Sequence, residues 1–524
     1  MQKGRLKKLR VFLSLLFFIV IAVLFLDFTG KIFSKATHAV LHLQFVPSVV
    51  QFVATLAPAA LGFVVIIILT LLFGRIYCST LCPLGTLQDL FSFAARKLSP
   101  RKIIYKYKKP VNWLRHGLMT VVILSLLTGS ILLVNLLDPY SAFGKIFHNL
   151  FRPLIVLINN ITSKALTFAD IYWLPHVKWV AVNKIALLIA LIWALTLLIF
   201  SVKRGRLYCN TLCPVGAVLG IFARFSLFRI RLDKTVCNSC GKCSAVCKAE
   251  CINPKDQSVD FSRCVGCMNC LSPCPDGGVK FLPFWKKDEV KISTYDPGKR
   301  KFIVESGILL AASMDISRVI FPQDEKKKEV IPGTIPIFRE HPVTPPGAIG
   351  QARFNSLCTA CHLCVSACPT QVLQPTYFLY GLSGFLQPRM DYITSFCNYE
   401  CTLCGEVCPT GAILTLSPEE KKLVQLGKAV FVRENCIVET RKTACGACSE
   451  HCPTKAVNMV PYQEKLTIPE VNNKICIGCG ACEYACPTDP KSIYVEGNPI
   501  HLLAEKPKEV KIEEKIDYKE EFPF

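Results

Sequence analysis

The chain has 524 residues, 51% of them hydrophobic, and its mean hydropathy of +0.38 excludes an ordinary soluble protein. Its 29 cysteines recur in closely spaced blocks, which excludes the disulfide framework of a small secreted domain. The net charge of +23 comes from residues 1–320, where 40 Lys and Arg accompany 14 Asp and Glu, and it indicates membrane topology, not a nucleic-acid partner.

Residues 1–229 contain four apolar runs, each close to the roughly 20 residues that cross a bilayer as a helix. The runs are Val11–Phe28, Ala57–Phe73, Leu114–Leu137 and Ile185–Val202. They predict a four-span membrane domain built from two α-helical hairpins. Lys and Arg are concentrated in residues 1–10 and after the second and fourth runs. The N-terminus is therefore expected on the cytoplasmic side of a bacterial cytoplasmic membrane, in a multi-pass protein.

A twelve-residue motif occurs twice in this domain. GRIYCSTLCPLG at residues 74–85 matches GRLYCNTLCPVG at residues 205–216 at nine of twelve positions. The motif cysteines are Cys78, Cys82, Cys209 and Cys213. By pseudo-twofold symmetry, their four thiolates would converge on a seventh metal centre. The alternatives are two redox-active dithiols, or cysteines that only cap re-entrant turns. Arg75 and Arg206 of the motif are expected to anchor at the lipid interface.

Residues 230–285 predict a ferredoxin-like domain with two clusters. Both cysteine blocks read C-x2-C-x2-C-x3-C, and the fourth cysteine of such a block ligates the other cluster. One [4Fe–4S] cluster is therefore expected on Cys237, Cys240, Cys243 and Cys274, and the other on Cys264, Cys267, Cys270 and Cys247. Residue 248 is Lys where Pro is usual. Cys251 is predicted to be a buried structural thiol, with a competing role as ligand left open.

Residues 286–350 form a linker. Its Lys299–Ile303 sequence, followed by the uncharged stretch Ser306–Met314, is interpreted as a decayed twin-arginine-like signal or a fifth membrane segment. The alternative is a cytoplasmic linker helix. Residues 501–524 alternate Lys and Glu and predict a charged, solvated tail.

Residues 351–500 hold four more cysteine blocks. They are Cys358/Cys361/Cys364/Cys368, Cys397/Cys401/Cys404/Cys408, Cys436/Cys445/Cys448/Cys452 and Cys476/Cys479/Cys482/Cys486. The expected fold is α+β, with a short helix after each Cys-Pro and brief strands near 411–416, 456–460 and 492–495. Because the clusters form part of the core, folding should depend on metal binding.

Six blocks of this kind predict six [4Fe–4S] clusters, which transfer single electrons. No G-x-G-x-x-G fingerprint or P-loop accompanies them. Residues 358–362, CTACH, have the C-x2-C-H spacing of a haem site, but they belong to a cysteine block that Cys364 and Cys368 complete. The chain is therefore expected to be an electron carrier and not a substrate-specific catalyst.

Two parts of the chain resemble known families. The apolar domain with Y-C-x-T-L-C-P motifs and a two-cluster domain resembles NapH-type membrane subunits of quinol dehydrogenases. Residues 436–453, CIVETRKTACGACSEHCP, resemble NapG/MauM-type polyferredoxins. The chain is thus similar to a fusion of the two, and its membrane half is also similar to NosR-type and CcoG-type proteins.

The resemblance implies a relay from the membrane quinol pool to a periplasmic reductase or multihaem cytochrome. It also implies a periplasmic position for residues 351–500. In the four-block half it pairs the first block with the last and the second with the third. The implied exchanges are Cys368 with Cys486, and Cys408 with Cys452.

A quinol site needs a proton acceptor near the membrane face, and ionisable groups there are rare. The candidates are His38, His42, Asp138, His148 and His176. Two other classes of function stay open: an assembly factor that reduces a metal or thiol of another enzyme, and a membrane redox sensor.

Overall fold

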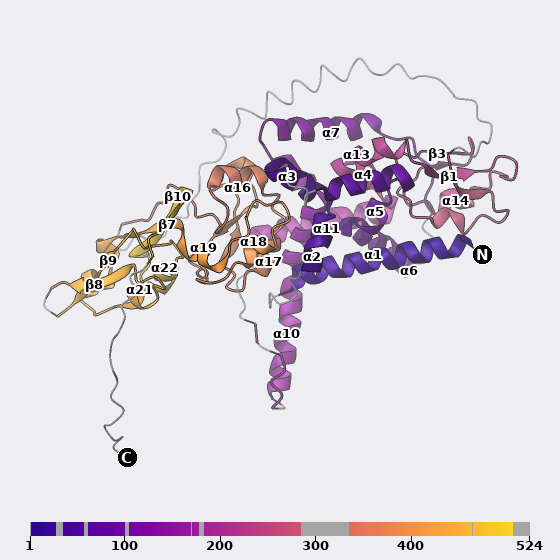
Figure 1. Ribbon diagram of the computed structural model, residues 1–524. Helices are drawn as coiled ribbons and strands as arrows, with labels where there is room; N and C mark the ends of the chain where they lie inside the picture. Colours follow the sequence, from indigo (N-terminus) through magenta and orange to yellow (C-terminus); the bar gives the residue numbers. More distant parts are fainter. Residues whose placement is uncertain are drawn as a thin grey trace, which may run out of the picture.

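The computed structural model describes residues 2–27, 35–56, 61–99, 104–284 and 335–506, apart from 169, 175, 178–182 and 464. A helical part occupies the middle of the molecule (Figure 1). The two-cluster domain lies at the end where α1 begins, and the four-block half lies at the opposite end. The linker residues 299–314 and the tail from residue 507 lie outside the described residues.

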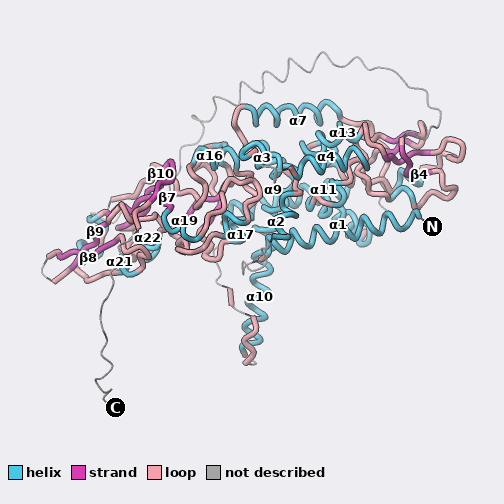
Figure 2. Tube along the Cα trace, in the orientation of Figure 1, coloured by secondary structure: helices cyan, strands magenta, loops and turns pink. Residues whose placement is uncertain are grey.

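The helical part, residues 2–227, is almost entirely α-helical, as Figure 2 shows. Its helices are α1 (Gln2–Leu26), α2 (Lys35–His42), α3 (Phe45–Thr55), α4 (Gly62–Phe73), α5 (Tyr77–Thr80), α6 (Pro83–Leu98), α7 (Asn112–Leu127), α8 (Leu132–Leu137), α9 (Pro139–Ile146), the π-helical turn η2 (Phe147–Phe151), α10 (Arg152–Thr167), α11 (Lys184–Arg204), α12 (Leu207–Thr211) and α13 (Pro214–Ala223).

Two of the four predicted spans are long enough to cross a membrane. Gly4–Leu26 and Lys184–Arg204 meet both length and hydropathy requirements. The second predicted run gives α4 with 12 residues, about 18 Å, against a hydrocarbon core of about 30 Å. The third is divided into α7 and α8 near Gly129, whose φ is +78°. The described residues therefore do not confirm four full spans, because two runs fold as shorter helices.

The two-cluster domain is held together by two small antiparallel sheets. β1 (Phe228–Leu232) pairs with β4 (Val279–Pro283), and β2 (Ile252–Asn253) pairs with β3 (Ser258–Val259). The helical pieces are α14 (Lys242–Ala245) and the 3₁₀ turn η3 (Asn269–Leu271). The β1–β4 pair joins the two ends of the domain, so both cysteine blocks lie between its strands in sequence.

The four-block half has three two-stranded antiparallel sheets. β5 (Leu373–Pro375) pairs with β6 (Pro388–Met390), β7 (Val424–Phe431) with β10 (Ile493–Leu503), and β8 (Val457–Pro461) with β9 (Thr467–Val471). Strands near 456–460 and 492–495 are thus confirmed, whereas residues 411–416 form no strand. The prediction of a helix after each Cys-Pro is wrong here, because in each block a short helix comes before the fourth cysteine. The helical pieces are α16 (Gln351–Leu357), α17 (Leu363–Ala367), η6 (Leu382–Gly384), α18 (Leu403–Glu406), α19 (Pro418–Leu423), η7 (Arg433–Asn435), α20 (Ile437–Arg441), α21 (Ala447–Glu450) and α22 (Ala481–Ala485).

A buried carboxylate joins the helical part to the two-cluster domain. Asp89 of α6 forms ion pairs with Arg10 of α1 at 3.1 Å, with Arg206 at 3.0 Å and with Lys248 at 3.1 Å. Lys248 is the residue that replaces the usual Pro after Cys247. Burial opposes ionisation of Asp89, but these three cations outweigh it and hold its pKa below the usual range. The carboxylate therefore stays charged at every physiological pH.

The helical part also contacts the four-block half directly. Arg152 donates a hydrogen bond to the Ser366 carbonyl at 3.0 Å, and His148 Nδ1 lies 2.8 Å from Ser366 Oγ. Gly144 packs so closely that a Cβ there would lie 2.2 Å from the Cys361 carbonyl oxygen. The first cysteine block is thus seated against α9 and η2.

We predict that Asp89→Asn detaches the two-cluster domain, because it leaves Arg206 buried without its counter-charge. Breaking a buried ion pair by removing one partner typically costs about 3–5 kcal/mol. A lowered melting temperature in detergent, with increased proteolysis of residues 230–285, would show this. Since the pKa of Asp89 is depressed by folding, its contribution is present at neutral pH and is lost only as the pH falls through the acid range.

Asp233→Asn is the matched control for this prediction. This substitution removes the ion pair between Asp233 and Lys280, and the Lys280 side chain is half exposed. The free energy of unfolding should therefore change little. Equal effects of the two substitutions would contradict the anchoring role of Asp89.

Candidate iron–sulfur centres

The two copies of the motif interlock through their arginines. Arg75 Nη2 donates to the Cys209 carbonyl at 2.9 Å, and Arg206 Nη1 donates to the Cys78 carbonyl at 2.8 Å. Each guanidinium also lies near the sulfur of its own copy, at 3.8 Å from Cys78 and 3.9 Å from Cys209. The two copies are therefore related by a pseudo-twofold arrangement in which each completes the other.

Three other identical positions of the motif have local reasons. Gly74 and Gly205 adopt positive φ angles of +75° and +63° where the preceding helices end. Gly85 and Gly216 leave room for the arginines, because a Cβ at Gly85 would lie 2.5 Å from Arg206 Nη1 and one at Gly216 would lie 2.7 Å from Arg75 Nη2. Pro83 begins α6, and its counterpart begins α13, which suits a first helical turn.

The arginine prediction from the sequence is wrong. Arg75 and Arg206 are 0% and 1% exposed and face the protein interior, not lipid. Arg75 also donates to Asn210 at 2.9 Å and to the Ser262 carbonyl at 3.0 Å. A guanidinium offers five donors, and here they are used to bind carbonyls of the opposite motif and of the two-cluster domain.

The convergence of the four motif thiols on one metal centre stays a prediction. All four are buried. Burial raises the pKa of Cys82 and Cys213, and the charges of Cys209 and Cys78 raise both further. Gln88 Nε2 lies 3.5 Å from the sulfur of Cys209, and Gly216 N lies 3.3 Å from that of Cys213. In such a buried site, the thiols would lose their protons only if a metal or the neighbouring hydrogen-bond donors stabilised the thiolates.

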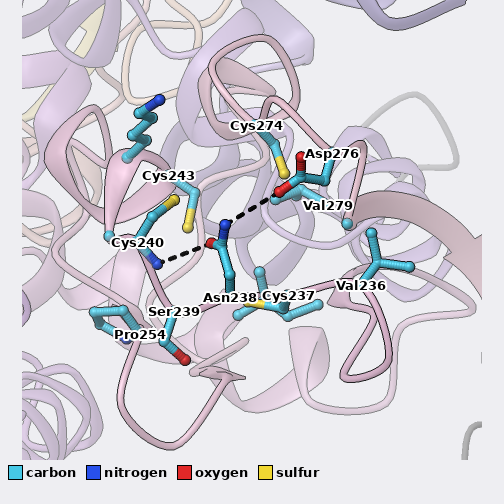
Figure 3. Close-up of a pocket in the computed structure, with 14 residues that line it drawn as sticks. Val236, Cys237, Asn238, Ser239, Cys240, Cys243, Pro254, Cys274, Asp276 and Val279 are labelled. Carbon is cyan, nitrogen blue, oxygen red and sulfur yellow. Dashed lines mark hydrogen bonds between the residues drawn. The ribbon is translucent and has the colours of Figure 1, made fainter.

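The four cysteines expected to hold the first cluster of the two-cluster domain lie together. A cavity is lined by Cys237, Cys240, Cys243 and Cys274, the four cysteines grouped from the crossed spacing (Figure 3). Asn238 fixes the loop between them, since its amide donates to Asp276 at 3.2 Å and its carbonyl oxygen accepts from Cys240 N at 3.2 Å.

The second site gathers Cys247, Cys264, Cys267 and Cys270. Besides burial, the charges of Cys267, Cys264 and Cys247 raise the pKa of Cys270. Cys251 is buried beside this group, with its sulfur 3.5 Å from that of Cys247. A hydrogen bond between these two thiols lowers the pKa of Cys247 to about 7. Cys251 is thus a buried thiol that contacts a predicted ligand.

The four-block half pairs neighbouring blocks, which corrects the nested pairing implied by the family. Burial raises the pKa of three thiols in one group, and the nearby Cys408 raises it further. These thiols are Cys358, Cys361 and Cys364. Cys368 acts in the same way on a second group: Cys397, Cys401 and Cys404. The latter four also line one cavity. The first block therefore exchanges its fourth cysteine with the second.

The third and fourth blocks make a second pair. The charge of Cys486 adds to burial in raising the pKa of Cys436 and Cys448. Cys452 does so for Cys476, Cys479 and Cys482. The two pairs meet where Cys397 N donates to the Cys479 carbonyl at 3.0 Å. Four sites thus follow one another through this half.

A polar group lies between the motif thiols and the first block. Asp138 caps α9 by accepting from Ser141 N at 2.8 Å and from Ser141 Oγ at 2.7 Å. Its charge adds to burial in raising the pKa of Tyr77 and Tyr208, which adjoin the motif cysteines. Tyr140 lies near both Asp138 and Cys361. The space between the two redox sites is therefore filled by side chains of α9 and the two motif tyrosines.

Two of the five quinol candidates lie at this junction. Asp138 is 1% exposed, and its Oδ1 has no hydrogen-bond partner among the described residues. His148 contacts His362 at 5.6 Å between ring centroids. His176 is exposed on a surface groove, His42 is partly buried in α2, and the side chain of His38 is not described.

Sequence reasoning missed Asp89 as the anchor of the two-cluster domain. Its signal was present, because Asp89 is the only acidic residue between Asp27 and Asp138, in a strongly basic region. Lys248 was noticed only as a departure from the Cys-Pro pattern. The distance between these residues in the sequence hides their contact.

From their spacing, the cysteine blocks are expected to hold four-iron clusters. No group of three or more His, Cys, Asp or Glu side chains in the described ranges is placed to hold one metal ion. A [4Fe–4S] cubane instead takes one thiolate at each of four separate irons. Cys237, Cys240, Cys243 and Cys274 line one cavity, and Cys368, Cys397, Cys401 and Cys404 line another.

Two family models match the chain. A "4Fe-4S binding domain" matches residues 55–101 and 186–234, which include all four motif cysteines. A "4Fe-4S dicluster domain" matches residues 357–412 and 443–489. The first match covers the first two blocks, and the second covers the fourth block and the third from Cys445 onward, so Cys436 lies outside it. Both matches join neighbouring blocks, as the structure does.

Curated relatives match less than half of this chain. It is 30% identical over 219 residues to "Putative electron transport protein YccM" of Escherichia coli, covering 42% of this chain and 54% of that protein. It is 25% identical over 227 residues to "Ferredoxin-type protein NapH" of Haemophilus influenzae, covering 42% and 66%. It is 27% identical over 207 residues to "Regulatory protein NosR" of Stutzerimonas stutzeri, covering 38% and 23%.

The chain thus spans about half the length of YccM. No solved structure matches it. Together the matches show 4Fe-4S ferredoxin-type domains and similarity to ferredoxin-type electron-transport proteins.

The neighbouring-block pairing predicts which thiols are released when one ligand is lost. In Cys408→Ser, the cluster held with Cys358, Cys361 and Cys364 should be weakened, because its fourth ligand is gone. Alkylation of the native protein under anaerobic conditions, followed by peptide mass spectrometry, should find these three cysteines newly modified. Nested pairing would instead release Cys436, Cys445 and Cys448, and that outcome would overturn the assignment.

Proposed function

We propose that this protein takes electrons from quinol in the bacterial cytoplasmic membrane and relays them to a partner reductase or multihaem cytochrome. When bound, six [4Fe–4S] clusters supply single-electron transfer, and a seventh centre at Cys78, Cys82, Cys209 and Cys213 supplies it within the helical part. The chain's own residues position the clusters one after another, exclude water from them and donate hydrogen bonds to their sulfur ligands.

The observation that carries this proposal is the order of the sites. The two-cluster domain, the motif thiols and the four-block half follow one another along the molecule (Figure 1). Asp89 and Arg75 join the first to the second, and α9 with η2 joins the second to the third. A relay requires each redox site to lie next to another along the path through the membrane part. A storage or sensing role does not require this order.

The helical part supports a crossing between the two ends. Arg10 of α1 pairs with Asp89 at the two-cluster end, whereas Phe25 of the same helix packs against Phe143 and Tyr140 near the first block. These 15 residues of helix rise by about 22 Å. With the N-terminus in the cytoplasm, the two-cluster domain would be cytoplasmic and residues 351–500 periplasmic.

For quinol oxidation, protons must leave as electrons enter. Asp138 is the acceptor favoured here, because its Oδ1 is buried and unpaired among the described residues and it lies between the two redox parts. Burial raises the pKa of Asp138, which favours uptake of a proton. Lys145 lies in the last turn of α9, and burial lowers its pKa to about 8.

A topology experiment tests the crossing. A protease-cleavable tag after Phe524 should be reached in intact spheroplasts, and a matched tag before Met1 should be reached only after lysis. Opposite accessibility is expected because the two ends of the relay would lie on opposite sides of the membrane. If both tags are protected until lysis, all six clusters are cytoplasmic and the transmembrane relay is wrong.

Iron content and electron flow test the seventh centre. We expect about 28 iron atoms per chain in the anaerobically purified protein, and about 24 in Cys213→Ser. Reduction of the remaining clusters by a menaquinol analogue in membranes should also slow in Cys213→Ser. Asp233→Asn, outside the motif and paired with the half-exposed Lys280, is the control and should keep both values. Equal iron in all three proteins would leave the motif cysteines as dithiols or structural caps.

A further inference from the structure

Helix α10 projects from the body of the molecule as an arm. It begins at the junction with the four-block half, where Arg152 donates to the Ser366 carbonyl. In Figures 1 and 2 it runs across the direction of α1 and extends beyond the other helices. α11, a candidate span, begins beside the same half, since Ala186 N donates to Tyr377 Oη at 3.1 Å. The arm therefore leaves the helical part at the level where the spans end.

One face of the arm is covered by the chain that follows it. Asn160 Nδ2 donates to the Val177 carbonyl at 2.9 Å, and Val177 N donates back to Asn160 Oδ1 at 2.9 Å. Ser163 Oγ donates to the Leu174 carbonyl at 2.8 Å. Val156 and Ser163 on this face are buried. The figures show this return segment on the side of α10 toward the four-block half.

The opposite face carries an apolar stripe. Its residues recur with helical spacing on one side of α10, and each is exposed: Leu154, Leu157, Ile158, Ile161 and, just past the helix end, Phe168. The stripe contains no charged residue. Ile161 is 61% exposed and Phe168 is 95% exposed. No residue in the described part of the chain covers this stripe.

The tip of the arm adds aromatic side chains. Tyr172 and Trp173, in the return segment, are 75% and 84% exposed. These two residue types are enriched at membrane–water interfaces, where the ring lies among headgroups and the polar atom reaches water. Lys164, exposed on the flank of the helix, supplies a positive charge at the same level.

We propose that the α10 arm lies in the plane of the membrane interface at the four-block end, with the apolar stripe toward phospholipid acyl chains. An amphipathic helix with one apolar face and one polar face binds a bilayer in this manner. The polar face and its return segment then lie toward water and the four-block half, which agrees with their placement beside α10. The arm would fix the height of the first cysteine block above the membrane.

This proposal rests on the membrane orientation of the proposed function, and photo-crosslinking separates the two. In full-length protein in native membranes, Ile161→p-benzoylphenylalanine should yield phospholipid adducts detected by mass spectrometry. Thr167→p-benzoylphenylalanine, exposed on the polar face of the same helix, should yield several-fold fewer. Phe12→p-benzoylphenylalanine reports the span α1, where Phe12 is 64% exposed.

The outcomes distinguish the occupants. Lipid adducts at Ile161 and Phe12, with several-fold fewer at Thr167, support the arm. Lipid adducts at Phe12 alone, with a polypeptide adduct at Ile161, would show that a partner protein or a second copy covers the stripe and would overturn the proposal. Absence of lipid adducts at Phe12 would instead contradict the membrane orientation itself.

Discussion

The exchange of arginines between the two motif copies is the contact on which the rest of the molecule depends. Arg75 binds a carbonyl of the second copy, and Arg206 binds a carbonyl of the first, so neither cysteine pair is in place without the other. The same guanidinium of Arg75 reaches Ser262 of the two-cluster domain. Two glycines leave space for these side chains. The helical part thus folds around a polar centre, which is unusual for apolar helices. Burying these polar groups is compatible with a stable fold only because their donors and acceptors are matched.

Local spacing predicted the ligand groups well wherever the cluster itself imposes the pattern. The sequence predicted that Cys274 joins the first block of residues 230–285, and these four cysteines line one cavity. The convergence of the motif thiols on a metal centre stays a prediction from the repeat. In contrast, the pairing among the four later blocks was wrong, because each block has the same internal spacing and nothing in it identifies its partner. Contacts between α17 and α18, and between α21 and α22, decide that pairing.

Apolar length was a weaker guide than cysteine spacing. Leu114–Leu137 reads as one span, but Gly129 divides it, and Ala57–Phe73 gives a helix of only 12 residues. Hydropathy measures how strongly a segment prefers lipid. It does not show whether the segment forms one continuous helix. The arginines at 75 and 206 were misplaced for a related reason: a basic residue beside an apolar run commonly marks the interface, and only the tertiary structure shows the carbonyls that bind it.

The ion pairs of Asp89 have a consequence for biosynthesis. Its partners are encoded far apart, at positions 10, 206 and 248, so the carboxylate leaves the ribosome with only Arg10 available. The second motif and the beginning of the two-cluster domain must be synthesised before the polar centre is complete. The polar centre of the helical part is therefore complete only when its first cluster-binding domain has been made.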